Sequence, residues 1–270
     1  MIVHFIGAGP GDPELLTLRA RRLIAACPVC LYAGSLVPAE VVAGAPPGAL
    51  HMLLSAAPPR GVPGALVRDT ASMTLEETHA AILDAHAKGQ DVARVHSGDP
   101  SLYGAIAEQI RLLRRDAVPY AICPGVPAYA AAAAALGQEL TVPEVAQSIV
   151  LTRVSMQSTS MPPGETLEAF AATGATLAIH LGVRALRDIV RRLSPLYGEG
   201  CPVAVCVRVG WPDQVLIRGT LSTIHAAVRE AKVTRTALIL VGPALGETSF
   251  PDSALYDPAH PHVLRPRARA

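Results

Sequence analysis

Charged residues are scarce in this sequence, and long apolar runs are missing. Only 17% of the 270 residues are charged, and the formal net charge is +1. So weak a charge provides no basic surface of the kind that binds nucleic acid or anionic lipid. No apolar run reaches the ~20 residues that span a bilayer, and the chain starts with a β-like run instead of the basic n-region of a signal peptide. We therefore expect a cytoplasmic protein without nucleic-acid or membrane partners.

Disulfide and metal-binding patterns are also lacking. The five cysteines, an odd number, are scattered through apolar segments, which favours buried thiols over a disulfide framework. Cys27 and Cys30 form a CxxC pair, but no second pair follows at the spacing of a zinc site. The nine histidines show no HExxH pattern. The sequence therefore predicts no bound metal, and it offers no Ser/His/Asp set or paired carboxylates, so the catalytic group stays unknown.

What the sequence does have is an alternation of β-like and helical segments, with half of its residues hydrophobic. This alternation is typical of α/β folds whose sheets are buried and largely parallel. We expect two successive α/β domains with mixed, largely parallel sheets and a ligand cleft between them. The predicted domains are residues 1–118 and 119–246, followed by a Pro/Arg-rich tail at 247–270.

A glycine-rich turn, Gly7–Pro13, follows the first expected strand. It differs from the dinucleotide fingerprint GxGxxG, because Asp12 stands where the last glycine is required. Pro10 also removes a backbone N–H that could bind phosphate. The chain contains no GK[ST] motif either. A nicotinamide or nucleotide-phosphate site at this turn is therefore disfavoured.

A second loop, Ser97–Gly104, follows the expected strand at 91–96 and precedes a helical pattern. A strand, a sharp loop and a helix in this order put the loop at the carboxyl edge of a parallel sheet, where ligands of open α/β folds bind. Gly98 has no side chain, so a ligand can approach its backbone closely. Asp99 is a candidate base, polar anchor or turn former. This loop is the first candidate binding element.

Three arginines, Arg153, Arg184 and Arg208, lie at or just after the carboxyl ends of expected strands in the second half. Guanidinium groups pair with carboxylates in a bidentate way, so three of them at one sheet edge would suit a ligand with several carboxylates. The alternative is that they are surface arginines whose stems cover apolar area.

Several of these segments together resemble one family. The run Gly7–Thr17, the loop Ser97–Gly104 and the turn Pro124–Val126 are similar to the S-adenosylmethionine-dependent tetrapyrrole (corrin/porphyrin) methyltransferases. Further segments extend the resemblance over residues 2–246 and are most similar to the members that methylate a ring carbon of a corrin-pathway tetrapyrrole: 130–144, 149–153, 202–221 and 236–242.

The resemblance implies a homodimer, S-adenosylmethionine as methyl donor and an anionic tetrapyrrole as substrate, for whose carboxylates the three arginines are the expected partners. In the implied reaction a ring carbon attacks a methyl group that the cofactor has already activated, so the protein mainly supplies proximity and alignment. Carried over by position, cofactor contacts fall on Pro10, Gly98, Asp99, Leu102, Pro127, Ala128, Leu181 and Ala237.

Other interpretations stay open at this point. Within the family, the ring position and the presence of cobalt in the substrate depend on the substrate pose, and a diphthamide intermediate is a different possible substrate. Outside the enzyme class, a non-catalytic tetrapyrrole-binding protein would hold the macrocycle without needing the methyl donor. Binding of S-adenosylhomocysteine would separate the enzyme from such a carrier.

Overall fold

The structure, a computed structural model, describes residues 1–32, 34, 36–44, 50–53, 67–69, 73–155, 160–253 and 260–261. It divides into two compact units. Unit 1 comprises Met1–Ala131 and Arg208–Gln214, and unit 2 comprises Ala132–Val207 and Val215–Ala270. Residues 254–259 and 262–270 of the expected tail lie outside the described residues.

Unit 1 is built on a six-stranded sheet in which every described pairing is parallel. Strand β6 pairs with β1, so the expected domain boundary between residues 118 and 119 differs from the division in the structure. Parallel strands bury both faces, and β1, β2 and β5 accordingly consist almost wholly of buried residues. The strands, in order across the sheet, are β4 (Val67–Asp69), β3 (Leu50–Leu53), β2 (Val29–Tyr32), β5 (Val92–His96), β1 (Val3–Gly7) and β6 (Tyr120–Cys123).

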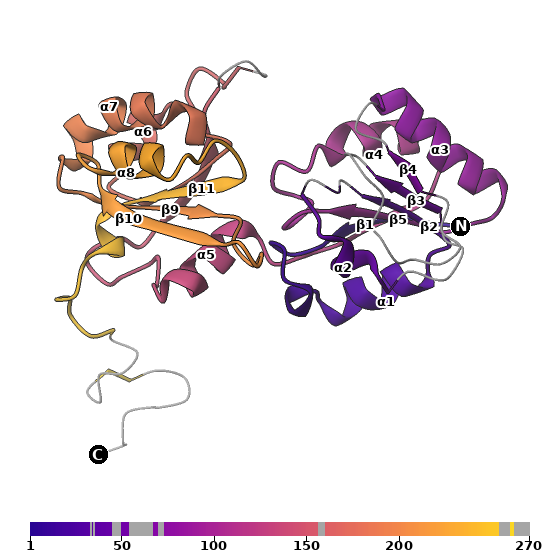
Figure 1. Cartoon of the computed structure of the whole chain (residues 1–270), viewed down its shortest axis with the longest axis horizontal. Coiled ribbons are helices and arrows are strands. Elements are labelled where there is room, and N and C mark those ends of the chain that lie inside the picture. The colour runs from indigo at the N-terminus through magenta and orange to yellow at the C-terminus, as the bar shows by residue number, and fades with distance from the viewer. Residues whose placement is uncertain are drawn as a thin grey trace. The chain divides into compact units, whose positions relative to one another are not determined.

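Helices cover both faces of this sheet (Figure 1). The short η1 (Pro13–Leu15), capped by the Asp12 carboxylate, leads into α1 (Leu18–Ala26), and α1 and α2 (Ala39–Val42) pack on one face. Helices α3 (Leu75–Ala87) and α4 (Ile106–Arg115) pack on the other. Thr74 and Glu77 form a capping box at the start of α3.

Unit 2 contains a five-stranded sheet that is mixed rather than largely parallel. Among its described strands only β7 and β8 pair in parallel, whereas β8–β11, β11–β9 and β9–β10 are antiparallel. Strands β9 and β10 are joined by the seven residues Arg208–Gln214, and so short a connection returns the chain in the opposite direction. The strands in order are β10 (Val215–Thr220), β9 (Pro202–Val207), β11 (Ala237–Val241), β8 (Thr176–His180) and β7 (Ile149–Arg153).

The core of unit 2 lies between this sheet and three helices on one face (Figure 1). These are α6 (Leu167–Ala171), α7 (Leu186–Tyr197) and α8 (Ile224–Glu230). Helix α5 (Ala128–Leu136) enters unit 2 at its C-terminal half, where Arg218 of β10 donates a hydrogen bond to the Leu136 carbonyl over 2.5 Å. The remaining 3₁₀ turns are η2 (Val183–Ala185) and η3 (Pro243–Leu245).

The five cysteines are free and buried, in agreement with the expected packing role. Burial raises the pKa of the Cys27 and Cys30 thiols to about 12. No helix among the described residues is long and apolar enough to cross a membrane.

Candidate functional site

The first sheet has a topological switch point at its two central strands. Strand β1 leads to α1 on one face of the sheet, whereas its neighbour β5 leads to α4 on the opposite face. The loops that follow β1 and β5 therefore diverge, and such a point is where open α/β sheets bind ligands. We call the carboxyl ends of β1 and β5, with the loops that follow them, the switch point.

Glycines bring the backbones at the switch point into close contact. Gly9 and Gly98 exchange two backbone hydrogen bonds, of 3.2 and 2.7 Å. A Cβ added at Gly7 would lie 2.4 Å from the Gly125 nitrogen, and one added at Gly125 would lie 2.3 Å from the Gly98 oxygen. The ends of β1, β5 and β6 can therefore approach each other only without side chains at these positions.

Gly98 differs from its two glycine neighbours. Its φ of +65° favours glycine, yet an added Cβ would have no atom closer than 3.8 Å. The nearest atoms belong to Pro127, which precedes α5, and to Ala128, which begins it. Two further residues expected at the cofactor thus lie beside Gly98, at a distance that leaves room for a methyl group without a clash.

Asp99 anchors the loop. One carboxylate oxygen accepts hydrogen bonds from the Ser101 backbone N–H, at 2.8 Å, and from the Ser101 hydroxyl. The other accepts the Gly125 N–H at 2.9 Å. Burial alone would raise the pKa of Asp99, but these hydrogen bonds outweigh it and hold the pKa below its usual value. Of the three roles considered for Asp99, the geometry favours the polar anchor, and the Leu102 N–H closes the turn on the Asp99 carbonyl.

A buried polar pair, Arg94 and Gln109, connects the two elements that flank the Ser97–Gly104 loop. Arg94 on β5 is only 6% exposed, and its Nε donates to Gln109 of α4 over 3.0 Å. Gln109 in turn donates to the Ala105 carbonyl over 2.9 Å. Burial lowers the pKa of Arg94 to about 10, so the guanidinium stays charged at neutral pH. The pair ties β5 to the start of α4, and so fixes both ends of the loop between them.

The turn after β1 is covered by the segment Arg208–Gln214 of unit 1. Trp211 donates its indole N–H to the Pro10 carbonyl over 3.0 Å. The Arg208 guanidinium lies 3.9 Å from the centre of the indole ring and donates Nε to Asp213 over 2.7 Å. Pro10 is buried in this arrangement.

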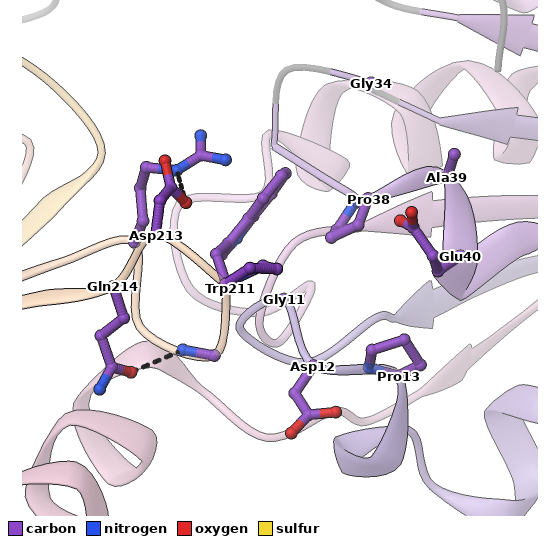
Figure 2. Close-up of a pocket in the computed structure, with 13 residues that line it drawn as sticks. Gly11, Asp12, Pro13, Gly34, Pro38, Ala39, Glu40, Trp211, Asp213 and Gln214 are labelled. Atoms are coloured by element: carbon purple, nitrogen blue, oxygen red, sulfur yellow. Dashed lines mark hydrogen bonds and ion pairs between the residues drawn. The ribbon is translucent and has the colours of Figure 1, made fainter. Parts of the chain in front are cut away.

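A pocket of about 980 Å³ opens beside Trp211 (Figure 2). Three acidic residues, Asp12, Glu40 and Asp213, line it together with Arg208, whose guanidinium is paired with Asp213. The pocket is within the size range of small-molecule sites. Because acidic groups outnumber the basic one, it favours N–H donors and cationic groups over carboxylates. The lining residues are Gly11, Asp12, Pro13, Gly34, Pro38, Ala39, Glu40, Arg208, Gly210, Trp211, Pro212, Asp213 and Gln214.

In unit 2, two expected cofactor contacts fall together at one sheet edge. Ile239 of β11 pairs with Ile179 of β8 in an antiparallel register; Ala237 begins β11, and Leu181 directly follows the end of β8. Leu181 has a φ of +54° and is 67% exposed. A left-handed backbone at an exposed leucine is costly, and such strain is concentrated at functional sites. This outlier supports the expectation of ligand contact at Leu181.

Of the three arginines, Arg153 and Arg184 belong to unit 2, at or after the carboxyl ends of β7 and β8, whereas Arg208 belongs to unit 1. Strands β7, β8 and β9 run in one direction, and the arginines end or follow them. Arg153 lies opposite His180 in the register, and Arg184 donates Nε to the Thr234 carbonyl over 3.1 Å. Arg208 follows β9 and is engaged by Asp213 and Trp211. The common strand direction is thus as expected, while the role of each arginine stays a prediction.

Among the described residues, no group of three or more His, Cys, Asp or Glu side chains could hold a metal ion. The described groups at the switch point include glycines, backbone atoms and Asp99, whose two carboxylate oxygens both accept hydrogen bonds. Open α/β folds bind small molecules at such an edge, so the switch point is the candidate ligand site of unit 1 in this α/β protein.

Comparison with known proteins identifies the family. The profile of the Tetrapyrrole (Corrin/Porphyrin) Methylases matches residues 2–225, and the chain belongs to this family. It is 53% identical to the precorrin-4 C(11)-methyltransferase of a Sinorhizobium species, over 99% of both chains.

Two solved structures extend this comparison. The X-ray structure of a cobalamin biosynthetic enzyme, cobalt precorrin-4 methyltransferase, is similar with a TM-score of 0.81 and 37% identity, covering 91% of this chain and 96% of that one. Uroporphyrin-III C-methyl transferase from Thermus thermophilus, complexed with S-adenosyl homocysteine, is similar with a TM-score of 0.69 and 28% identity, covering 91% and 99%.

Some residues of the site were not found by sequence reasoning. Trp211 and Gly11 lie 200 positions apart in the sequence and meet only in the fold. Arg94 could have been noticed in the sequence, because a charged residue inside an expected buried strand must have a polar partner. Gly125 stood in a motif, but its contact with Gly7 depends on the pairing of β6 with β1.

Proposed function

We propose that the protein transfers the methyl group of S-adenosylmethionine to carbon C(11) of precorrin-4, giving precorrin-5 in cobalamin biosynthesis. The observation that carries this proposal is the 53% identity, over 99% of both chains, with a precorrin-4 C(11)-methyltransferase. The switch point of unit 1 provides the independent structural support, because it places an open glycine at the edge where such sheets bind ligands.

The switch point fits S-adenosylmethionine as methyl donor. The backbone at Gly98 is accessible because nothing fills the position of its missing side chain, and Pro127 and Ala128 lie beside it. When bound, the cofactor supplies a sulfonium-activated methyl group. The protein's own contribution is to hold the loop rigid: Asp99 is bonded through both carboxylate oxygens, and Gln109 fixes the start of α4.

The residues at the switch point favour catalysis by alignment rather than by a strong base. The Asp99 carboxylate is fully used in hydrogen bonds, so it orients the loop and does not compete for a substrate proton. Holding an activated methyl and an attacking ring carbon in contact can supply most of the required acceleration. The function therefore needs a rigid frame, which the contacts among Gly7, Gly98 and Gly125 provide.

The substrate carries several carboxylates, and we propose that Arg153, Arg184 and Arg208 bind them. The pocket beside Trp211 is less suited to these groups because its own carboxylates would repel them. Arg208 is already paired with Asp213, so its contribution should be the smallest of the three. Loss of one charge-assisted hydrogen bond costs roughly 1.5–3 kcal/mol, or about one to two decades in kcat/KM.

Kinetics of the single alanine variants test the arginine proposal. Arg153→Ala and Arg184→Ala should raise KM for the tetrapyrrole while the affinity for S-adenosylhomocysteine stays within about twofold. Raising the salt concentration should weaken substrate binding by the wild type, because exposed charge pairs are screened. Wild-type kcat/KM in all three variants at low salt would refute this use of the arginines.

Cobalt-precorrin-4 is the second candidate substrate, because the cobalt precorrin-4 methyltransferase has a similar fold. The identity of 53% to the precorrin-4 enzyme against 37% to the cobalt enzyme favours the metal-free substrate. Assays with metal-free and cobalt-loaded precorrin-4 side by side distinguish the two. A homodimer and a cytoplasmic location, both expected from the sequence, are parts of the same proposal, and sedimentation analysis tests the first.

The decisive experiment uses S-adenosylmethionine labelled with ¹³C in its methyl group. Incubation with precorrin-4 should transfer the label, and NMR of the product should place it on C(11). Label at another ring carbon would assign the protein to a different step of the same chemistry. Binding of precorrin-4 without any methyl transfer would instead identify a non-catalytic tetrapyrrole-binding protein and refute the proposed activity.

A further inference from the structure

Trp211 is held against the turn that follows β1. Its indole Nε1–H donates to the Pro10 carbonyl over 3.0 Å, across a sequence separation of 201 residues. Proline has no backbone N–H, so the carbonyl is the one hydrogen-bonding group of Pro10. The indole N–H therefore binds the one backbone group of Pro10 that can form a hydrogen bond, and it fixes the direction in which this carbonyl points.

The contact is close enough to require glycine on both sides. A Cβ at Gly11 would lie 2.3 Å from two atoms of the indole ring, Cδ1 and Nε1. A Cβ at Gly210 would lie 3.0 Å from the Asp12 nitrogen and 3.2 Å from the Pro10 ring. Figure 2 shows Trp211 beside Gly11, and both residues line the pocket. The turn after β1 cannot change its shape without moving the indole.

The indole is itself held in place by its own segment. The Arg208 guanidinium stacks on the ring at 3.9 Å and is fixed by Asp213. Arg208 has a φ of +46°, a conformation that an L-residue keeps only where surrounding contacts impose it. The Gly210 N–H donates to the Gln214 side chain over 3.0 Å, and the Gln214 N–H donates to the Trp211 carbonyl. Trp211 is thus presented to the turn by a rigid loop.

The turn that Trp211 holds is part of the switch point. Gly9, one residue before Pro10, exchanges backbone hydrogen bonds with Gly98. The position of the Pro10 peptide is therefore coupled, through two short backbone contacts, to the open glycine where the methyl donor is expected. If the turn shifted, Gly98 would shift with it, and the backbone surface offered to a ligand at Gly98 would change.

We propose that Trp211 is a positioning residue for the methyl donor. It keeps the Gly9–Gly11 turn in the conformation that binds S-adenosylmethionine, acting through its hydrogen bond to Pro10 and its packing on Gly11. This inference rests on the proposed function and adds to it a residue outside the β1 and β5 loops. Trp211 is also the single tryptophan of the chain, so tryptophan fluorescence reports on the surroundings of this one residue.

Three variants and one ligand test the proposal. Trp211→Phe keeps an aromatic ring but removes the N–H, and Trp211→Ala removes both. Tyr197→Phe is the matched control, because it removes a comparable aromatic donor to a backbone carbonyl, that of Ala175, within unit 2. The affinity for S-adenosylhomocysteine is measured by calorimetry, and the emission of Trp211 is followed during the titration of the wild type.

We expect Trp211→Phe to weaken binding about 2- to 10-fold, the range that corresponds to the net loss of one hydrogen bond. Trp211→Ala should weaken it further, Tyr197→Phe should bind as the wild type does, and the ligand should shift the wild-type emission. With a tetrapyrrole substrate, Trp211→Phe should raise KM for S-adenosylmethionine and leave kcat within about twofold.

Equal affinity in the wild type and Trp211→Phe would overturn the inference, and so would an equal loss in Tyr197→Phe. Trp211→Phe retains the ring, so this test remains valid if Trp211→Ala fails to fold. A wild-type protein that does not bind S-adenosylhomocysteine would refute the proposed function and this inference with it. Binding by the wild type with unchanged variants would refute this inference alone.

Discussion

Gly7 ends β1 and Gly98 lies in the loop after the neighbouring strand β5, yet replacing each with alanine should have opposite consequences. At Gly98 the new Cβ would have no atom within 3.8 Å, so the fold can accept it. The φ of +65° imposes the left-handed penalty of an L-residue, about 1–2 kcal/mol. At roughly 2–4 °C per kcal/mol for a protein of this size, Gly98→Ala should lower Tm by about 2–8 °C.

The methyl group of Gly98→Ala would enter the space assigned to the methyl donor. Overfilling a packed site costs roughly 1–3 kcal/mol, which corresponds to a loss of affinity of roughly 5- to 150-fold. Calorimetric titration with S-adenosylhomocysteine measures it. Gly89→Ala is the matched control: its φ of +67° carries the same strain, and nothing lies within 4 Å of an added Cβ. It should reproduce the fall in Tm and keep wild-type affinity.

Gly7→Ala should instead damage the fold. Its Cβ would lie 2.4 Å from the Gly125 nitrogen and 2.7 Å from the Gly98 oxygen, and backbone atoms cannot rotate away. We expect a loss of more than about 3 kcal/mol, or a Tm lower by about 10 °C or more. Equal affinity for the ligand in Gly98→Ala and Gly89→Ala would refute the placement of the donor at Gly98. A Gly7→Ala protein as stable as the wild type would refute the packing argument.

Two further predictions concern the frame of the protein. Two hydrogen bonds from Arg192, both of 2.6 Å, lower the pKa of the Glu168 carboxyl to about 2. The pair therefore stabilises the fold fully at pH values above the ordinary carboxyl pKa, and this stabilisation is lost as the pH falls through the lowered pKa. Glu168→Gln should lower the free energy of unfolding by less than about 1 kcal/mol at pH 7. In urea unfolding, the difference between the variant and the wild type should vanish towards pH 2. A difference that stays constant with pH would contradict this linkage. Burial raises the pKa of the Cys201 and Cys206 thiols to about 11, and that of Cys30 to about 12. Ellman's reagent at pH 8 should therefore detect these thiols only after denaturant is added, and rapid reaction of the native protein would show that they are accessible.

Much of the fold could be predicted because its strands are buried and compact. The strand expected at 91–96, for example, is observed as β5 at Val92–His96. Strand direction in the second sheet could not be predicted, since alternating β and α segments look alike whether a connection crosses over or turns back. The connection between β9 and β10 has only seven residues, which is too short for a crossover and therefore makes this pair antiparallel, but its length is known only once the bounds of both strands are known.

The candidate site was predictable where it depends on local geometry. Gly98 could be placed because a glycine directly after a buried strand marks a sheet edge, and its neighbours Pro127 and Ala128 follow the strand beside β1. The contact between Trp211 and Pro10 could not be predicted, because it joins segments 201 residues apart whose meeting depends on the packing of the whole unit. Ligand binding by these residues stays a prediction.

The membership of Arg208–Gln214 in unit 1 has a consequence for synthesis on the ribosome. When residue 131 has been added, the six strands of the first sheet are complete, but the tryptophan that holds the Pro10 carbonyl is still untranslated. The chain must grow by a further 83 residues before Gln214 exists. At roughly 5–20 residues per second this takes about 4–17 s, far longer than local folding events require. The nascent N-terminal unit therefore passes through a period in which its sheet can form while the Pro10 carbonyl still lacks the indole N–H that binds it in the complete chain.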